Sequence, residues 1–184
     1  MWNAIATFLT NSSAITIIVI AWLSVYFILS FTILLSRYLA LGVWRAKEQS
    51  ALESILIGGK IENTSSVLKK CSSSVNKEKL DVYIGLAESR STSGLTLLAI
   101  VASTSPFIGL FGTVVGILET FADLGDGTGG INAIARSISE ALVATGCGIF
   151  VAIPAYSFNL LIKRKAYEIL SLIKREASVL LSNK

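Results

Sequence analysis

The sequence predicts an all-α integral membrane protein with three transmembrane helices and long cytoplasmic helical extensions. Hydrophobic residues make up 53% of the 184 positions and charged residues only 15%, and the mean hydropathy is +0.69. This balance is typical of a polytopic membrane protein and untypical of a soluble domain. In addition, three stretches lack charged side chains over about the 20 residues that a helix needs to cross a hydrocarbon core.

The first of these stretches, residues 14–36, is rich in bulky aliphatic side chains and is expected to face lipid. A short segment without side-chain charge, residues 1–13, precedes it, and no cleavage signal of small residues lies before Arg37. We therefore interpret it as a retained span and not as a signal peptide. The second span is expected over residues 95–118 and the third over residues 137–162.

The distribution of Lys and Arg predicts the orientation. Basic residues outnumber acidic ones in residues 37–94 and 163–184, whereas the segment between the second and third spans, residues 119–136, is acidic. Because basic residues accumulate on the cytoplasmic side, residues 37–94 are predicted to be a cytoplasmic helical region and residues 163–184 a cytoplasmic C-terminal helix. Residues 1–13 and 119–136 are then periplasmic. The basic surplus follows from this topology, so no nucleic-acid partner is predicted.

The cytoplasmic regions have the spacing of helices. One helix continues from the first span as far as the Gly58-Gly59 pair, a short helix is expected over 62–70, and another leads from Lys77 into the second span. The C-terminal helix carries an apolar stripe, which needs a partner outside the bilayer. That partner is either the other helices of the same subunit or a neighbouring subunit. The stripe consists of Ile169, Leu172, Ile173 and Leu180.

Small residues recur at intervals of three and four in the second and third spans, which places them on one face of each helix. Such faces let two helix backbones approach closely, and Gly112 and Gly116 form a literal GxxxG motif. Thr113 and Thr145 add a hydroxyl to each stripe. The residues expected to pack these helices together are Gly109, Gly112, Gly116, Gly148, Pro106 and Pro154.

Glu140 is the one acidic residue that leads directly into a span. Arg136, four residues earlier, is placed to form an ion pair with it. Glu140 either lies in the first turn of a helix at the water interface or lies inside the bilayer. The second position requires the helix to begin near Ile131. An ionised side chain at the bilayer centre costs at least about 2.5–3.5 kcal/mol, so buried carboxyls usually serve an ion pathway.

No catalytic residue, metal site or cofactor is predicted. The chain has no His, and the glycine-rich run at residues 125–130 lacks the G-K-[ST] ending of a phosphate loop. Cys71 is expected in the cytoplasmic region and Cys147 inside the third span, so the two do not form a disulfide framework.

Two motifs resemble those of the ExbB/TolQ proton-channel family. They are SPFIGLFGTVVGI over residues 105–117, and ISEALVATG over residues 138–146 followed by VAIPA over residues 151–155. The likeness is dense between residues 104 and 164. Val115 stands where the family has a tryptophan. The motifs leave open whether the chain is similar to ExbB or to TolQ.

The resemblance implies a homo-pentamer in the bacterial inner membrane, in contact with membrane lipids, around the single spans of a dimeric ExbD or TolR partner. It implies that Glu140 matches the essential glutamate of the third span, and that Thr113 and Thr145 line the ring interior. An Asp of the partner would carry the proton. Proton flow would then energise TonB or TolA.

Two other functions are compatible with a small polytopic protein. One is a membrane scaffold that clusters partners without conducting ions. The other is a flagellar-stator subunit of the MotA type, but that protein has four spans, and a fourth apolar stretch is not found in this sequence.

Overall fold

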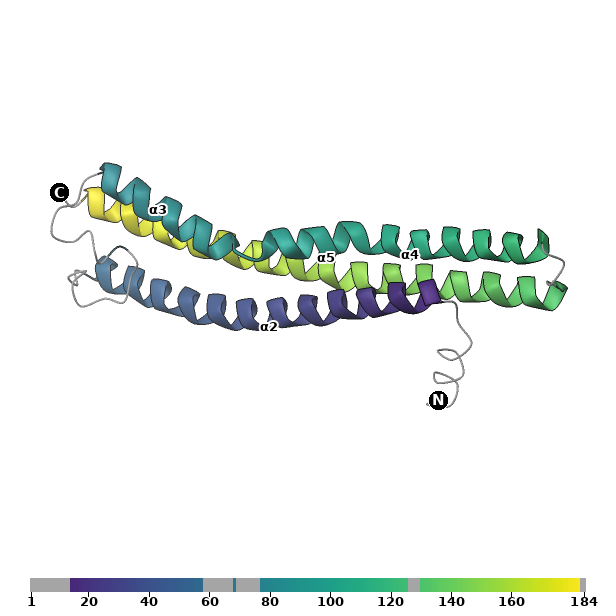
Figure 1. Cartoon of the computed structure of the whole chain (residues 1–184). Helices are drawn as coiled ribbons and strands as arrows, with labels where there is room; N and C mark the ends of the chain where they lie inside the picture. The colour runs from purple at the N-terminus through teal and green to yellow at the C-terminus, as the bar shows by residue number, and fades with distance from the viewer. Residues whose placement is uncertain (1–13, 58–67, 69–76, 126–129, 183–184) are drawn as a thin grey trace. The chain divides into compact units, whose positions relative to one another are not determined.

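The structure is a computed structural model that describes residues 14–57, 68, 77–125 and 130–182. The described part is built from α-helices (Figure 1), which are α2 (Ala14–Leu56), α3 (Lys77–Thr92), α4 (Leu95–Gly125) and α5 (Ile131–Ser182). The predicted segment 1–13 lies outside the described residues, as does the predicted short helix over 62–70 apart from Leu68.

Three described helical segments are long and apolar enough to cross a membrane, namely Ala14–Ile55, Lys77–Ala122 and Ile134–Ser182. This confirms the predicted fold class. At a rise of 1.5 Å per residue, the 43 residues of α2 and the 52 residues of α5 are about 65 Å and 78 Å long. A hydrocarbon core is only about 30 Å thick, so both helices continue well beyond any membrane that they cross.

The chain divides into two compact units. The first contains the N-terminal part of α2 up to Thr32 together with Leu97–Phe158, and the second contains Ile33–Thr96 together with Asn159–Lys184. Both α2 and α5 therefore contribute residues to each unit.

The core of the first unit joins α2, α4 and α5 through buried aliphatic and alanine side chains, which are Val19, Leu23, Val101, Ala144, Val151 and Ala155. Phe27 of α2 stacks on Phe150 of α5, with ring centroids 5.8 Å apart. The opposite face of α2 is exposed, for example at Ile18 and Ile28. An apolar face of this kind agrees with the expectation that the first span contacts lipid.

The core of the second unit joins α2, α3 and α5, and α3 lies beside the C-terminal part of α5 (Figure 1). Ile169 and Ile173 of α5 are fully buried, as are Leu41 of α2 and Leu80 of α3. Each such side chain stabilises the fold by about 1.5–3 kcal/mol relative to an exposed one. Of the two partners considered for the apolar stripe, helices of the same subunit cover these two isoleucines.

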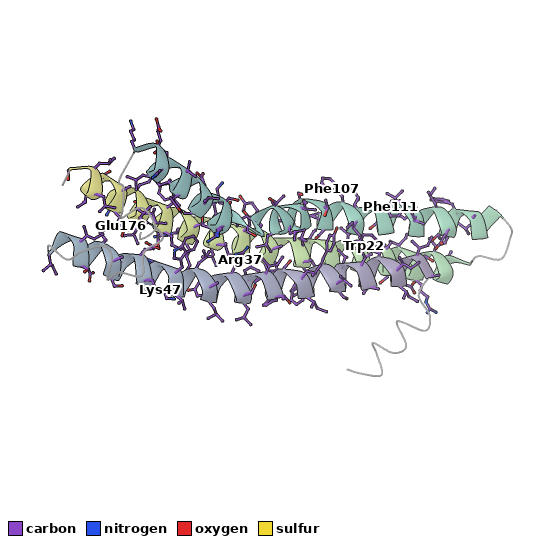
Figure 2. The ribbon with its side chains drawn as sticks, turned by 60° about the vertical axis from the view of Figure 1, so that its left-hand side comes forward. Trp22, Arg37, Lys47, Phe107, Phe111 and Glu176 are labelled. Carbon is purple, nitrogen blue, oxygen red and sulfur yellow. The ribbon has the colours of Figure 1, made fainter. Side chains whose placement is uncertain are left out.

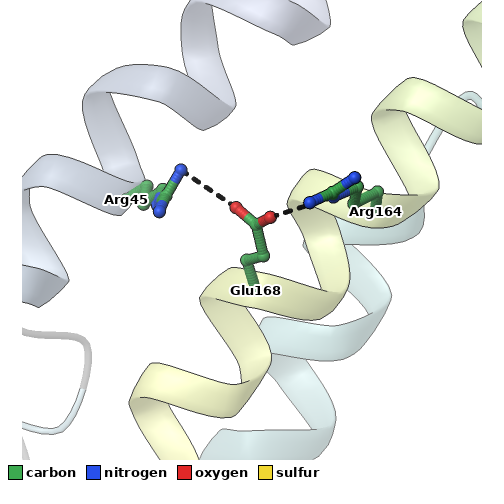
Figure 3. A network of polar contacts seen from close by, with 3 residues as sticks. All are labelled: Arg45, Arg164 and Glu168. Carbon is green, nitrogen blue, oxygen red and sulfur yellow. Dashed lines mark hydrogen bonds and ion pairs between the residues drawn. The ribbon is translucent and has the colours of Figure 1, made fainter.

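Polar contacts also join α2 to α5 in the second unit. The Glu168 carboxylate accepts from Arg45 of α2 at 2.9 Å and from Arg164 of its own helix at 3.3 Å (Figure 3). The Lys165 ammonium lies 3.1 Å from the centroid of the Tyr38 ring. Partly exposed ion pairs contribute little stability, so these contacts chiefly set the register of α2 against α5.

The predicted helix from Lys77 into the second span is wrong at one point, because the structure breaks it between α3 and α4. Gly94 has a φ of 85°, which other residues rarely adopt. The Asn159 side chain of α5 donates to the Leu95 carbonyl at 2.7 Å, next to the break. A lone glycine is often tolerated within a helix, so the sequence signal for this break is weak.

Candidate functional site

The closest approach between α4 and α5 is a contact of two backbones at Gly109 and Gly148. A Cβ atom on Gly148 would lie 2.6 Å from the Ser105 carbonyl oxygen and 3.1 Å from the Gly109 Cα. A Cβ atom on Gly109 would lie 2.8 Å from the Ala144 carbonyl oxygen. Because the obstructing atoms belong to backbone, neither position has room for a larger residue.

The spacing widens toward the C-terminal end of α4. A Cβ atom on Gly112 would meet Ala144 at 3.2 Å and Val19 of α2 at 3.3 Å, so all three helices meet there. At Gly116 the nearest atom, the Ala141 Cβ, is 3.4 Å away, which is an ordinary contact. The glycines named from the sequence thus lie along one contact face between α4 and α5.

Pro106 lies within α4 and Pro154 within α5, and both helices continue through them. A proline has no N–H, so each leaves one carbonyl of the preceding turn without its usual helical donor. The neighbouring Ser105 is buried and donates its hydroxyl to the Val101 carbonyl. The Ser105 carbonyl in turn faces Gly148. Pro106 therefore adjoins the closest point of the α4–α5 contact.

Thr113 and Thr145 meet across this contact, and we call them the threonine pair. Their hydroxyl oxygens are within hydrogen-bond distance of each other. The Thr113 hydroxyl also donates to the Ala141 carbonyl of α5 at 3.0 Å, and the Thr145 hydroxyl donates to the Gly109 carbonyl of α4 at 3.2 Å. Each threonine thus binds backbone of the opposite helix.

The threonine pair has two hydroxyl hydrogens and three interhelical contacts to satisfy. Since each hydroxyl has one hydrogen and can accept from another, one contact is always without a hydrogen between its oxygens. The hydrogens can therefore be redistributed by rotation of the hydroxyls while both helices stay in place. Such a redistribution is what a hydrogen-bonded path for protons requires.

Glu140 is two and a half turns from the beginning of α5, because the helix begins at Ile131. Of the two positions considered for Glu140, the one inside the bilayer requires a helix that begins near Ile131, as α5 does. Its side chain is only 14% exposed, and Oε1 accepts from Arg136 Nε at 3.1 Å. The Arg136 side chain is 54% exposed. The ion pair considered from the sequence is therefore formed.

The structure brings Thr113 and Thr145 together, but it directs Glu140 to Arg136 and not to the hydroxyls. At 100° per residue, Glu140 and Thr145 flank the buried positions of α5 from opposite sides, and those positions are Ala141, Ala144 and Gly148. The backbone of Ala141 connects Glu140 to the threonine pair, because Ala141 follows Glu140 in the chain and its carbonyl accepts from Thr113. The sequence did not predict this connection, since every residue has a backbone carbonyl.

Within the described ranges, no group of three or more His, Cys, Asp or Glu side chains could hold a metal ion. Cys147 is a half-buried free thiol in α5, and Cys71 lies outside the described residues.

Replacing Thr113 by valine should lower the free energy of unfolding by about 0.6–1.7 kcal/mol, from the average to the largest value measured for interhelical hydrogen bonds in a membrane protein. Valine keeps the shape of threonine but cannot donate to Ala141. Thermal unfolding of the purified protein in detergent measures the change. Thr104→Val is the matched control, since that hydroxyl donates to Ile100 within α4. Equal losses at both positions would show that the interhelical bond contributes nothing.

The sequence is similar to a known family and to proteins named ExbB or ExbB-like. Residues 48–175 match the model of the MotA/TolQ/ExbB proton channel family. A Helicobacter pylori (strain 26695) protein named ExbB-like 1, described as a biopolymer transport protein, is 38% identical over 189 residues, which cover 100% of both chains.

Shorter stretches match proteins named ExbB. The biopolymer transport protein ExbB of Neisseria gonorrhoeae is 53% identical over 70 residues, 37% of this chain and 32% of its own length. The protein of the same name from Xanthomonas campestris pv. campestris (strain B100) is 49% identical over 73 residues, 39% and 29% of the two chains. With a family match over more than half of its length and an end-to-end relative, this chain belongs to the MotA/TolQ/ExbB proton channel family.

Proposed function

We propose that the chain is the proton-conducting subunit of an inner-membrane complex of the ExbB–ExbD or TolQ–TolR kind, which uses the proton motive force to energise TonB or TolA. The observation that carries the proposal is the threonine pair, which joins two helices long and apolar enough to cross a membrane. The mostly buried side chain of Glu140 lies on one of these helices, five residues before Thr145. Hydroxyls and a carboxyl at this place have no catalytic partner among the described residues. They suit the transfer of protons along hydrogen bonds.

In this proposal Glu140 accepts and releases the proton, and the threonine pair guides it between α4 and α5. An aspartate on the single span of the partner takes the proton up in turn. One elementary charge that crosses the membrane releases about 2.3 kcal/mol per 100 mV. Repeated transfers then drive the movement of the ring against the partner dimer.

A homo-pentamer accounts for the exposed apolar side chains of α4. Phe107 and Phe111 project outward from α4 (Figure 2) and are 70% and 61% exposed. Leu142 on α5 is 63% exposed. In the assembled ring these side chains would contact neighbouring subunits or membrane lipids, both of which remove them from water.

The names of the relatives favour the ExbB–ExbD–TonB version over the Tol version. A relative that aligns from end to end is named ExbB-like, and two proteins that match shorter stretches at about half identity are named ExbB. We therefore propose import across the outer membrane, and not envelope integrity, as the process that is energised.

The proposed topology places residues 1–13 and 119–136 in the periplasm and residues 37–94 and 163–184 in the cytoplasm. We expect Gly130→Cys to react with a membrane-impermeant maleimide in spheroplasts, and Ser178→Cys to react only after permeabilisation. Both residues are exposed, and the proposed topology puts them on opposite sides of the membrane. The background should lack Cys71 and Cys147. If Ser178→Cys reacted in spheroplasts and Gly130→Cys only after permeabilisation, the chain would have the opposite orientation in the membrane.

Proton uptake by vesicles tests the function itself. The chain is reconstituted with and without a single-span partner of the ExbD or TolR kind, and an internal pH dye reports flux under an imposed voltage. A proton-conducting subunit gives flux that depends on the partner. A scaffold gives no flux in either preparation.

A further inference from the structure

Arg136 and Glu140 form an ion pair within the first three turns of α5, and the two members differ in exposure. The Glu140 side chain is 14% exposed and the Arg136 side chain 54% exposed. Arg136 Nε donates to Glu140 Oε1 at 3.1 Å, so the guanidinium lies directly beside the carboxylate. An ion that binds the carboxylate therefore also comes close to the guanidinium.

An arginine keeps its positive charge at every pH at which proteins are stable, and its nitrogens donate hydrogen bonds but accept none. When a hydronium ion gives a proton to the Glu140 carboxylate, an O–H bond forms, water leaves, and the charge of the pair changes from zero to +1. No ligand other than the carboxylate oxygen is required for this step.

A sodium or potassium ion requires more ligands than a proton does. It is a hard cation that takes several oxygen ligands, and it would have to gather them within a few ångströms of a permanent positive charge. The hydroxyls of the threonine pair contact each other and backbone carbonyls of α4 and α5. A guanidinium beside the carboxylate therefore disfavours a metal cation much more than a proton.

We infer that Arg136 is the residue that positions Glu140 and makes the site select protons over alkali cations. The inference rests on the proposed function, because it assumes that ions reach Glu140. It goes beyond that function, since it assigns selectivity to a residue outside the two motifs that carry Glu140 and the threonine pair.

The chain offers a matched control on the same helix. Arg164 and Glu168 form a second pair with the same spacing of four residues and a distance of 3.3 Å between Arg164 Nε and Glu168 Oε1. Arg164→Gln removes the same chemical group from α5 in the second unit, far along the helix from Glu140.

The test uses the complete complex in vesicles and measures proton flux and sodium flux separately, with a pH dye and a sodium dye. Arg136→Gln should raise the ratio of sodium to proton flux by about fivefold, the effect of one partly exposed charge pair. Arg136→Lys, which retains the charge, should leave the ratio near that of the wild type. Arg164→Gln should leave it unchanged. An unchanged ratio in Arg136→Gln overturns the inference, and so does a raised ratio in Arg136→Lys.

If Arg136→Gln does not assemble, Arg136→Cys in a background without Cys71 and Cys147 decides the question. A positively charged aminoethyl thiosulfonate reagent, added to the assembled complex, should restore proton selectivity, and a neutral methyl reagent should not. Equal ratios with both reagents contradict the inference.

Glu140→Gln in the same assay separates the two proposals. Normal proton flux in that variant refutes the role of Glu140 itself. Lost flux, together with an unchanged flux ratio in Arg136→Gln, refutes only the role of Arg136.

Discussion

Replacing Glu140 by glutamine should abolish proton flux through the reconstituted complex and leave the ring assembled. Glutamine has the size of glutamate, and its carbonyl oxygen can still accept from Arg136 Nε, so the contact at 3.1 Å has a replacement. An amide cannot take up and release a proton at neutral pH, and the path is therefore interrupted. Dye-based flux in vesicles measures the loss, and native mass spectrometry in detergent counts the subunits.

The control for this variant is Glu168→Gln, which neutralises another paired carboxyl on α5. Its flux should equal that of the wild type, because Glu168 belongs to the second unit and joins α2 to α5. Wild-type flux in Glu140→Gln would support the non-conducting scaffold. Loss of both flux and assembly would instead assign Glu140 a structural role, which Glu140→Asp could test by restoring the charge.

Gly148→Ala should destabilise the protein by about 1–3 kcal/mol, the usual cost of adding a methyl group to a tightly packed core. The new Cβ would lie 2.6 Å from the Ser105 carbonyl oxygen, so α4 and α5 would have to separate. The threonine pair would lose its interhelical contacts, and flux should fall along with stability. Thermal unfolding and vesicle flux on the same preparation measure both effects.

Gly146→Ala provides the comparison, because nothing lies within 4 Å of a Cβ built at that position. Gly146→Ala should gain about 1 kcal/mol of helix propensity, whereas Gly148→Ala should lose about 1–3 kcal/mol in total, so the two variants should differ by about 2–4 kcal/mol in the free energy of unfolding. If the two variants were equally stable, the proposed backbone contact between Gly148 and α4 would not exist in the membrane.

Much of the fold could be predicted from the sequence because the bilayer imposes simple rules. A stretch without charge must be long enough to cross the hydrocarbon core, and the three such stretches correspond to the apolar parts of α2, α4 and α5. The helix ends were less predictable. The break at Gly94 depends on a backbone conformation, and the start of α5 at Ile131 precedes the predicted third span by two turns of weakly apolar residues.

The candidate site was predictable where it depends on side-chain size and spacing. Intervals of three and four placed Thr113 and Thr145 on the small-residue faces, and the structure joins them. The acceptors for their hydroxyls, the carbonyls of Gly109 and Ala141, could not be predicted, because every residue has a carbonyl and only the register of two helices selects which ones meet.

The contact between Gly109 and Gly148 also restricts how this gene can evolve. When a side chain in a packed core grows, a second mutation that shrinks its neighbour often restores the fit. Here both partners are already glycine, and the atoms in contact are backbone atoms that every residue possesses. A genetic screen for suppressors of Gly148→Ala should therefore recover no change at Gly109. Suppressors should arise where the path of α4 can be altered, with Pro106 as the first position to sequence.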